Sequence, residues 1–162
     1  MDRMIATLFG IGHLRPGSGT WASAATVALG YGLHRLGHFP LVALGTVAAI
    51  LLGFWSVRRF TAGMADKDRG EIVIDEVAGQ MIALCATSGG FWFAGLPADV
   101  FPWPGAVAPF LFFRLFDIWK PWIIGRADRR ADADGVMMDD IWAGVFAAAA
   151  AILAAGISHG VM

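Results

Sequence analysis

The stretch "EIVIDEVAGQMIAL", residues 71–84, places two adjacent carboxylates, Asp75 and Glu76, at the edge of an apolar segment. The apolar residues continue to about residue 96, and a helix that crosses a membrane needs about 20 residues. Charged side chains are costly at such a boundary, and ionisable residues there indicate a functional site by default. The stretch therefore predicts a membrane helix over 76–96 that begins at a functional site.

The whole chain has the composition of a membrane protein. Of its 162 residues, 57% are hydrophobic and only 15% are charged, and the mean hydropathy is +0.64. Soluble domains usually carry about 45–50% apolar and about 25% charged residues. The length suits one domain over residues 1–162. The net charge of −1 gives no electrostatic basis for nucleic-acid binding, and nothing in the sequence indicates an obligate protein partner.

Four further apolar runs predict an all-α membrane bundle of about five helices. Besides 76–96, the expected helices cover residues 21–39, 40–57, 104–122 and 140–160. The run over 40–57 is the clearest of them, because it holds no charged residue. The first and fourth runs are short or interrupted by charges, so the sequence leaves open whether they cross completely.

Basic residues fall almost entirely on one side of this topology. With five crossings, one face receives the N-terminus and the loops 58–75 and 117–139. That face holds Arg3, Arg15, Arg58, Arg59, Lys67, Arg69, Arg114, Lys120, Arg126, Arg129 and Arg130. The opposite face holds only Arg35. Because basic loops remain in the cytoplasm, we expect a cytoplasmic N-terminus.

Carboxylates from three separate segments gather at the same cytoplasmic face. The set comprises Asp66, Asp68, Glu71, Asp75, Glu76, Asp117, Asp139 and Asp140. One acid at a helix start is explained as a cap that offsets the helix dipole. Capping does not explain doubled acids, nor Asp117 near the end of a helix, where negative charge is unfavourable. A shared ligand is therefore a better explanation for the cluster.

Packed carboxylates repel one another unless a cation lies between them. Oxygen ligands without neighbouring histidine or cysteine suit Mg²⁺, and Mn²⁺ is the alternative. His34 and His38 are four residues apart but lack the remaining ligands of a zinc site. The sequence therefore predicts a magnesium site at the cytoplasmic interface.

Positive charge lies beside the acids. In "FRLFDIWKPW", residues 113–122, the side chains of Arg114, Asp117 and Lys120 are three residues apart, so successive pairs are neighbours on a helix. They form either an ion-paired face or the cations that a phosphoryl group needs beside a metal. The glycine-rich stretch 15–21, "RPGSGTW", is either a flexible entry loop or a loop whose N–H groups approach a ligand.

Four motifs, taken together, resemble the bacterial phosphatidylglycerophosphatase A family. They are "GTWAS" at 19–23, "DKDRGEIVIDEVAG" at 66–79, "FRLFDIWKPW" at 113–122 and "MMDDIWAG" at 137–144. The resemblance covers about Leu8 to Gly144. It implies a magnesium-dependent, multi-pass enzyme of the bacterial inner membrane, with its active site facing the cytoplasm. Its substrate would be the lipid phosphatidylglycerophosphate, which it would hydrolyse to phosphatidylglycerol and phosphate in phospholipid biosynthesis.

The resemblance also implies roles for individual residues. The implied catalytic carboxylates are Asp68, Asp75, Glu76, Asp117, Asp139 and Asp140, and all of these except Asp68 are implied metal ligands. The implied phosphate-binding residues are Thr20, Ser23, Arg114 and Lys120. The N-terminal loop departs from the family, which often reads Pro-Gly-Thr-x-Gly-Ser there. The number of metal ions and the choice between water and a carboxylate as nucleophile stay open.

One alternative function belongs to a different class. A small membrane transporter or channel subunit would use the acidic cluster as a path for cations. Such a path needs acids at several depths of the membrane, whereas these gather at one face. The lipid phosphatase is therefore the favoured interpretation.

Overall fold

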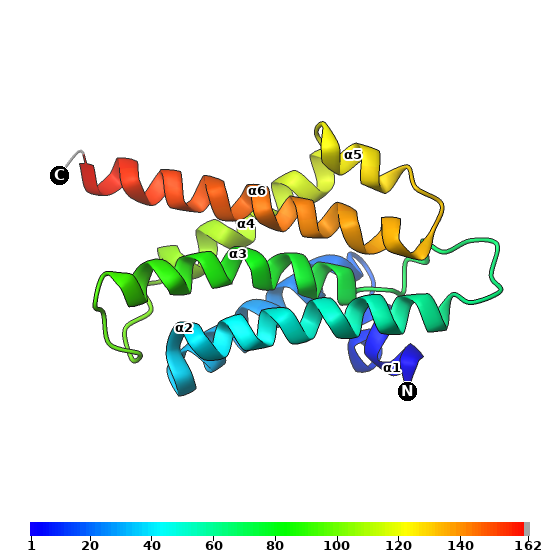
Figure 1. Cartoon of the computed structure of the whole chain (residues 1–162), viewed down its shortest axis with the longest axis horizontal. Helices are drawn as coiled ribbons and strands as arrows, with labels where there is room; N and C mark the ends of the chain where they lie inside the picture. Colours follow the sequence, from blue (N-terminus) through cyan, green and yellow to red (C-terminus); the bar gives the residue numbers. More distant parts are fainter. Residues whose placement is uncertain (161–162) are drawn as a thin grey trace.

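The computed structural model describes residues 1–160, and every regular element within them is helical. The elements are α1 (Asp2–Ala6), the 3-10 segment η1 (Leu8–His13), α2 (Ser18–Phe60), α3 (Ile74–Phe93), α4 (Pro104–Trp119), α5 (Ile123–Asp128) and α6 (Ala133–Gly160). The expected all-α fold is confirmed. Figure 1 shows α3 between α2 and α6, with α1, α5 and the α2–α3 loop toward one end of the molecule.

Helix α2 is a 43-residue element that folds back on itself. Gly37 and His38 leave the helical conformation, with φ values of −155° and 55°. The two arms pack together, since a Cβ at Gly45 would meet the Leu33 side chain at 2.7 Å. The reversal lies at the expected boundary between two helices. Pro40 falls in the first turn of the second arm, where its missing N–H costs no helical hydrogen bond.

Helix α6 begins earlier than the sequence indicated. We expected a helix over 140–160 with Asp139 and Asp140 at its start, but α6 begins at Ala133. The carboxylate of Asp132 accepts the N–H of Gly135 at 2.7 Å and so caps the first turn. Asp139 and Asp140 therefore lie well inside the helix, beyond the four free N–H groups that a cap would satisfy.

Helix α4 ends earlier than expected, at Trp119 rather than at residue 122. Lys120 adopts φ 49° and ψ 52°, a left-handed conformation that only a few per cent of non-glycine residues adopt. Pro121 follows, and a proline disfavours helical backbone in the residue before it. The chain consequently turns at Lys120 and returns as α5, which packs against α6.

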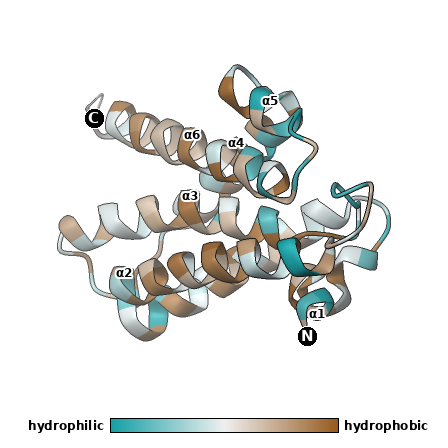
Figure 2. Cartoon of the chain, turned by 45° about the vertical axis from the view of Figure 1, so that its right-hand side comes forward, coloured by the Kyte–Doolittle hydropathy of each residue, from teal (hydrophilic) through white to brown (hydrophobic). Residues whose placement is uncertain are grey.

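Among the described residues 1–160, two helices are long and apolar enough to cross a membrane, namely α2 and residues Ala133–Ser158 of α6. Large apolar side chains on both are exposed, including Leu36, Leu44, Leu153 and Ile157. Hydrophilic residues instead gather around α1, α5 and the α2–α3 loop (Figure 2). This distribution is typical of a protein whose helices contact lipid and whose polar end meets water.

Candidate active site

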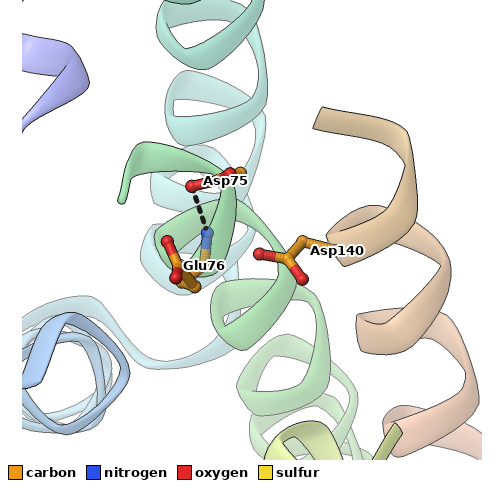
Figure 3. A group of neighbouring side chains, drawn as sticks. All are labelled: Asp75, Glu76 and Asp140. Atoms are coloured by element: carbon orange, nitrogen blue, oxygen red, sulfur yellow. Dashed lines mark hydrogen bonds between the residues drawn. The ribbon is translucent and has the colours of Figure 1, made fainter. Parts of the chain in front are cut away.

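The carboxylates of Asp75 and Glu76 on α3 meet Asp140 on α6. Each offers an oxygen, and these three oxygens lie within 4.8 Å of one another. Figure 3 shows the Asp140 side chain extending from its helix toward the two acids of α3. Asp75 and Asp140 are 8% and 4% exposed, so water screens their charges only weakly. Two residues adjacent in the sequence and one from a distant helix thus form a single buried cluster.

A close crossing of α3 and α6 creates this cluster. A Cβ at Gly144 would fall on the backbone of Gly79, and a Cβ at Gly79 would fall on the Asp140 carbonyl oxygen. Gly79 lies four residues after Asp75, and Gly144 lies four residues after Asp140. Each glycine therefore lies one helical turn beyond a carboxylate, on the same face. Neither glycine was predicted as a site residue, although the shared spacing of Asp and Gly in "DEVAG" and "DIWAG" is a usable signal.

Lys120, between α4 and α5, contacts Asp139, the residue before Asp140 of the cluster. Its ammonium donates to Asp139 Oδ2 at 2.9 Å and also forms an ion pair with Asp128. Partial burial alone would lower the pKa of Lys120, but the hydrogen bonds to Asp128 and Asp139 outweigh it and raise the pKa above its usual value. The side chain therefore stays charged throughout the physiological range. Asp128 was not predicted as a site residue.

Arg114 and Asp117 form an ion pair on α4, with 2.5 Å between Nη1 and Oδ2. The first turn of α2 packs against this region, because a Cβ at Gly19 would fall on Glu76 Oε1 and lie 3.3 Å from Arg114 Nη1. Gly19 thus permits the approach of α2 to the carboxylate of Glu76. The glycine-rich stretch 15–21 was expected either as a flexible loop or as a loop that approaches a ligand, and the contact of Gly19 with Glu76 was not predicted.

A cavity of about 130 Å³ lies at this end of the bundle. It is lined by all six predicted carboxylates, Asp68, Asp75, Glu76, Asp117, Asp139 and Asp140, together with Lys120. Further lining comes from residues that the sequence analysis did not select, among them Ser18, Arg69, Gly70, Asp128 and Arg130. The volume has room for several water molecules or for a small polar ligand.

The predicted hydroxyl residues lie outside the lining of this cavity. Ser23 is fully buried and donates to the Gly19 carbonyl at 2.8 Å, one turn back in α2. Thr20 is exposed. The hydroxyl that does line the cavity belongs to Ser18, which donates to the Gly70 carbonyl at 3.1 Å. Arg114 also is not among the residues that line the cavity. Phosphate binding by Thr20, Ser23 and Arg114 therefore stays a prediction.

The donor set fits a divalent cation. Within residues 1–160, three buried carboxylate oxygens have no hydrogen-bond partner, namely Glu76 Oε2, Asp139 Oδ1 and Asp140 Oδ1. Two like charges about 4 Å apart repel by about 4 kcal/mol at an effective dielectric constant of 20. The one hydrogen bond recorded within the trio, from the Glu76 N–H to Asp75 Oδ1, contributes about 1 kcal/mol. Hydrogen bonding therefore does not offset the repulsion, whereas Mg²⁺ bound to hard oxygen ligands would.

Fold and site together define a class: an all-helical, membrane-associated protein with a buried cluster of oxygen ligands at its polar end. The family model for Phosphatidylglycerophosphatase A matches residues 4–155, and the chain belongs to that family.

Relatives support this assignment. Phosphatidylglycerophosphatase A of Haemophilus influenzae is 34% identical over 145 residues, which cover 89% of this chain and 82% of the relative. The Escherichia coli protein of the same name is 34% identical over 146 residues, covering 90% and 78%. A Bacteroides thetaiotaomicron protein named "Putative phosphatidylinositol-3-phosphatase" is 28% identical over 150 residues, covering 88% and 86%. No solved structure matches the chain. None of these comparisons supports the transporter or channel interpretation.

Proposed function

We propose that this protein hydrolyses phosphatidylglycerophosphate to phosphatidylglycerol and phosphate in a reaction that depends on Mg²⁺, with Mn²⁺ as the alternative ion. The observation that carries the proposal is the meeting of Asp75, Glu76 and Asp140 in one cavity, with buried oxygens that no protein donor satisfies. Membership of the family supports the substrate. The lipid would reach the site from the membrane that the apolar helices contact.

Asp75, Glu76 and Asp140 would hold the metal ion, with Asp117 as a further ligand, and Asp139 would lie beside the ion without ligating it. Bound Mg²⁺ supplies positive charge beside the phosphate oxygens, where negative charge develops during phosphoryl transfer. Asp75 also accepts the Glu76 N–H at 3.1 Å, so one carboxylate serves both the helix start and the site.

Lys120 would bind a phosphate oxygen directly. An ammonium has three N–H donors, and Asp128 and Asp139 engage two of them. The third donor is available to a ligand in the cavity that Lys120 lines. Because its two partners fix the ammonium in place, binding a phosphate requires little further ordering of the side chain.

Asp139 would act as the base. Its Oδ2 is held by Lys120, while its buried Oδ1 has no partner within the described residues. Water attacks phosphorus, the bond from phosphorus to the glycerol oxygen breaks, and Asp139 Oδ1 accepts a proton from the water. The proton then passes to the glycerol oxygen, so the carboxylate is regenerated.

We further propose that the two arms of α2 and the helices α3, α4 and α6 make five crossings of the bacterial inner membrane. The N-terminus and the cavity would then face the cytoplasm. The clustering of basic residues near that end supports this orientation. A Cys85→Ser protein with a single new cysteine, Lys67→Cys or Asp99→Cys, tests it in intact cells. A membrane-impermeant thiol reagent should label only the second variant, and the reverse pattern would contradict the orientation.

Phosphate release from phosphatidylglycerophosphate by the detergent-purified protein tests the activity. Release is expected with Mg²⁺ and is expected to stop when EDTA is added. Phosphatidylinositol 3-phosphate is the second substrate to compare, because the Bacteroides relative is named for it. Failure to release phosphate from phosphatidylglycerophosphate with either Mg²⁺ or Mn²⁺ would contradict the proposal, and faster release from the inositol lipid would reassign the substrate.

A further inference from the structure

A second cavity, of about 340 Å³, adjoins the carboxylate cavity. The two share a wall made of Asp68, Arg69 and Gly70. The second cavity is otherwise lined by His13, Arg15, Asp66 and Glu71. It thus lies between the N-terminal segment and the α2–α3 loop, and the proposed mechanism does not use it.

Most cations around the two cavities are already paired with carboxylates. Lys120 binds Asp128 and Asp139, and Arg130 binds Asp132. Glu71 pairs with three more basic residues. Arg69 donates to its carboxylate at 3.0 Å, a nitrogen of Arg3 lies 3.4 Å from the carboxylate, and a nitrogen of His13 lies 3.5 Å from it.

Arg15 is the exception. In the part of the chain that the structure describes, it is the one basic residue lining either cavity for which no ion pair with a carboxylate is found. Its guanidinium lies against the shared wall, since a Cβ at Gly70 would be 3.8 Å from Arg15 Nη2. Ser18 contacts the same residue from the first cavity by donating to the Gly70 carbonyl. Arg15, which lines the second cavity, and Ser18, which lines the first, therefore both lie next to Gly70 in the shared wall.

The substrate of the proposed reaction carries two phosphates. The terminal monoester is the group that is removed, and a phosphodiester joins the glycerol headgroup to diacylglycerol. A site that holds such a headgroup needs donors near each phosphate. Asp66, Asp68 and Glu71 also line the second cavity, so Arg15, as its unpaired cation, is the residue there that can bind an anion. An unpaired guanidinium has the planar donor geometry that binds phosphate oxygens in pairs.

We propose that Arg15 binds the diester phosphate of the lipid headgroup in the second cavity while the terminal phosphate occupies the carboxylate cavity. This inference rests on the proposed function. Arg15 is then a residue that determines specificity: it favours lipids with a diester next to the monoester over phosphatidic acid, whose only phosphate is a monoester.

Kinetics with Arg15→Gln, Arg15→Lys and the control Arg126→Gln test the proposal. Arg126 is exposed and lines neither cavity. Arg15→Gln should raise KM for phosphatidylglycerophosphate about tenfold, equivalent to about 1.4 kcal/mol, while kcat changes less than twofold. Arg15→Lys should recover part of the loss, and the control should match wild type. An unchanged KM in Arg15→Gln would overturn the proposal, and so would an equal loss of kcat/KM for phosphatidic acid.

Binding without catalysis separates this inference from the proposed function. The probe is phosphatidylglycerol, which has the diester but no monoester, titrated into detergent-purified protein without divalent metal. Arg15→Gln should weaken its binding about tenfold, and Arg126→Gln should not. Suppose that the wild type releases no phosphate, yet Arg15→Gln binds phosphatidylglycerol more weakly than the other two proteins do. The assigned reaction is then wrong, and the anion site stands. If hydrolysis is normal and the three proteins bind the probe equally, the site is wrong and the reaction stands.

Discussion

Gly79 of α3 and Gly144 of α6 lie backbone to backbone, and no other residue type fits at either position without a shift of the helices. Small residues that let helices approach closely are common in membrane proteins. Here the approach has a chemical consequence, because each glycine is one turn beyond a carboxylate of the cluster. The distance between the helices therefore sets the distance between Asp75 and Asp140.

Gly79→Ala and Gly144→Ala should separate the two helices. Overpacking of this kind costs about 1–3 kcal/mol, and the carboxylate oxygens would move apart with the backbones. We expect a lower melting temperature in detergent, loss of most phosphatase activity and weaker stabilisation by Mg²⁺. Thermal unfolding with and without Mg²⁺ measures the melting temperature and the stabilisation by the ion, and phosphate release measures the activity.

Gly156→Ala is the matched control for this pair. Gly156 lies on α6, and a Cβ there would meet nothing within 4 Å. Replacing an unconstrained helical glycine by alanine stabilises a helix by about 0.5–1 kcal/mol. If Gly144→Ala behaved like Gly156→Ala in both stability and activity, the close crossing would not control the site.

Gly19→Ala should impair the site from the side of α2. Its Cβ would fall on Glu76 Oε1, so either the carboxylate changes rotamer or the first turn of α2 moves. Activity should fall at least tenfold with little change in the melting temperature, because a side chain can move where a backbone cannot. Gly32→Ala on the same helix is the control, since a Cβ at Gly32 would meet nothing within 4 Å. Equal activities of the two variants would show that the contact does not matter.

Removing single carboxylates should abolish the reaction without unfolding the protein. Asp75→Asn, Asp117→Asn and Asp140→Asn keep the side-chain volume but lose a charge. Each should lower phosphate release at least a hundredfold. The apo forms of Asp75→Asn and Asp140→Asn should be no less stable than wild type because repulsion within the cluster decreases, whereas Asp117→Asn should lose stability because Arg114 loses its ion-pair partner. Asp99→Asn is the control, because Asp99 is exposed and lines neither cavity. Near-wild-type rates in all three variants would refute the site.

The N-terminal segment should be held less firmly at low pH. Partial burial would raise the pKa of Glu71, but the hydrogen bond from Arg69 and the charges of Arg69, Arg3 and His13 outweigh it and hold the pKa below its usual value. A lowered pKa in the folded protein means stabilisation that is present above the unfolded pKa and lost as the pH falls through the folded one. Hydrogen exchange in residues 2–13 should therefore increase below about pH 4.

Glu71→Gln should remove this pH dependence. Its N-terminal segment should exchange faster than wild type at pH 7 and show no further increase at acidic pH. If hydrogen exchange in residues 2–13 depended on pH in the same way in wild type and Glu71→Gln, a group other than Glu71 would cause the effect. The Val73 N–H still binds the Ala6 carbonyl at 2.9 Å, so the segment should stay partly attached in either case.

The sequence predicted the helical class, the reversal of α2 and the gathering of six carboxylates, because hydropathy and charge placement are visible residue by residue. It did not predict that α6 starts at Ala133, since Asp132 in an acidic, glycine-containing stretch is as typical of a loop as of a cap. Pro121 predicts that the helix before it stops or kinks, and α4 does end before Pro121. The left-handed conformation of Lys120 was not predicted, because it has no sequence signal. Gly79 and Gly144 were not predicted, and Gly19 was expected only as part of a loop that approaches a ligand. The contacts that require these three glycines form only where two helices meet.

The central claim is that α3 and α6 together bind a divalent metal ion. Mn²⁺ binding to the detergent-purified protein, followed by electron paramagnetic resonance and competed with Mg²⁺, tests it without any substrate. We predict that the wild type and Asp99→Asn bind Mn²⁺ with the same affinity. Asp75→Asn, Glu76→Gln and Asp140→Asn should each bind it at least tenfold more weakly. Equal Mn²⁺ affinity in all five proteins would contradict the account.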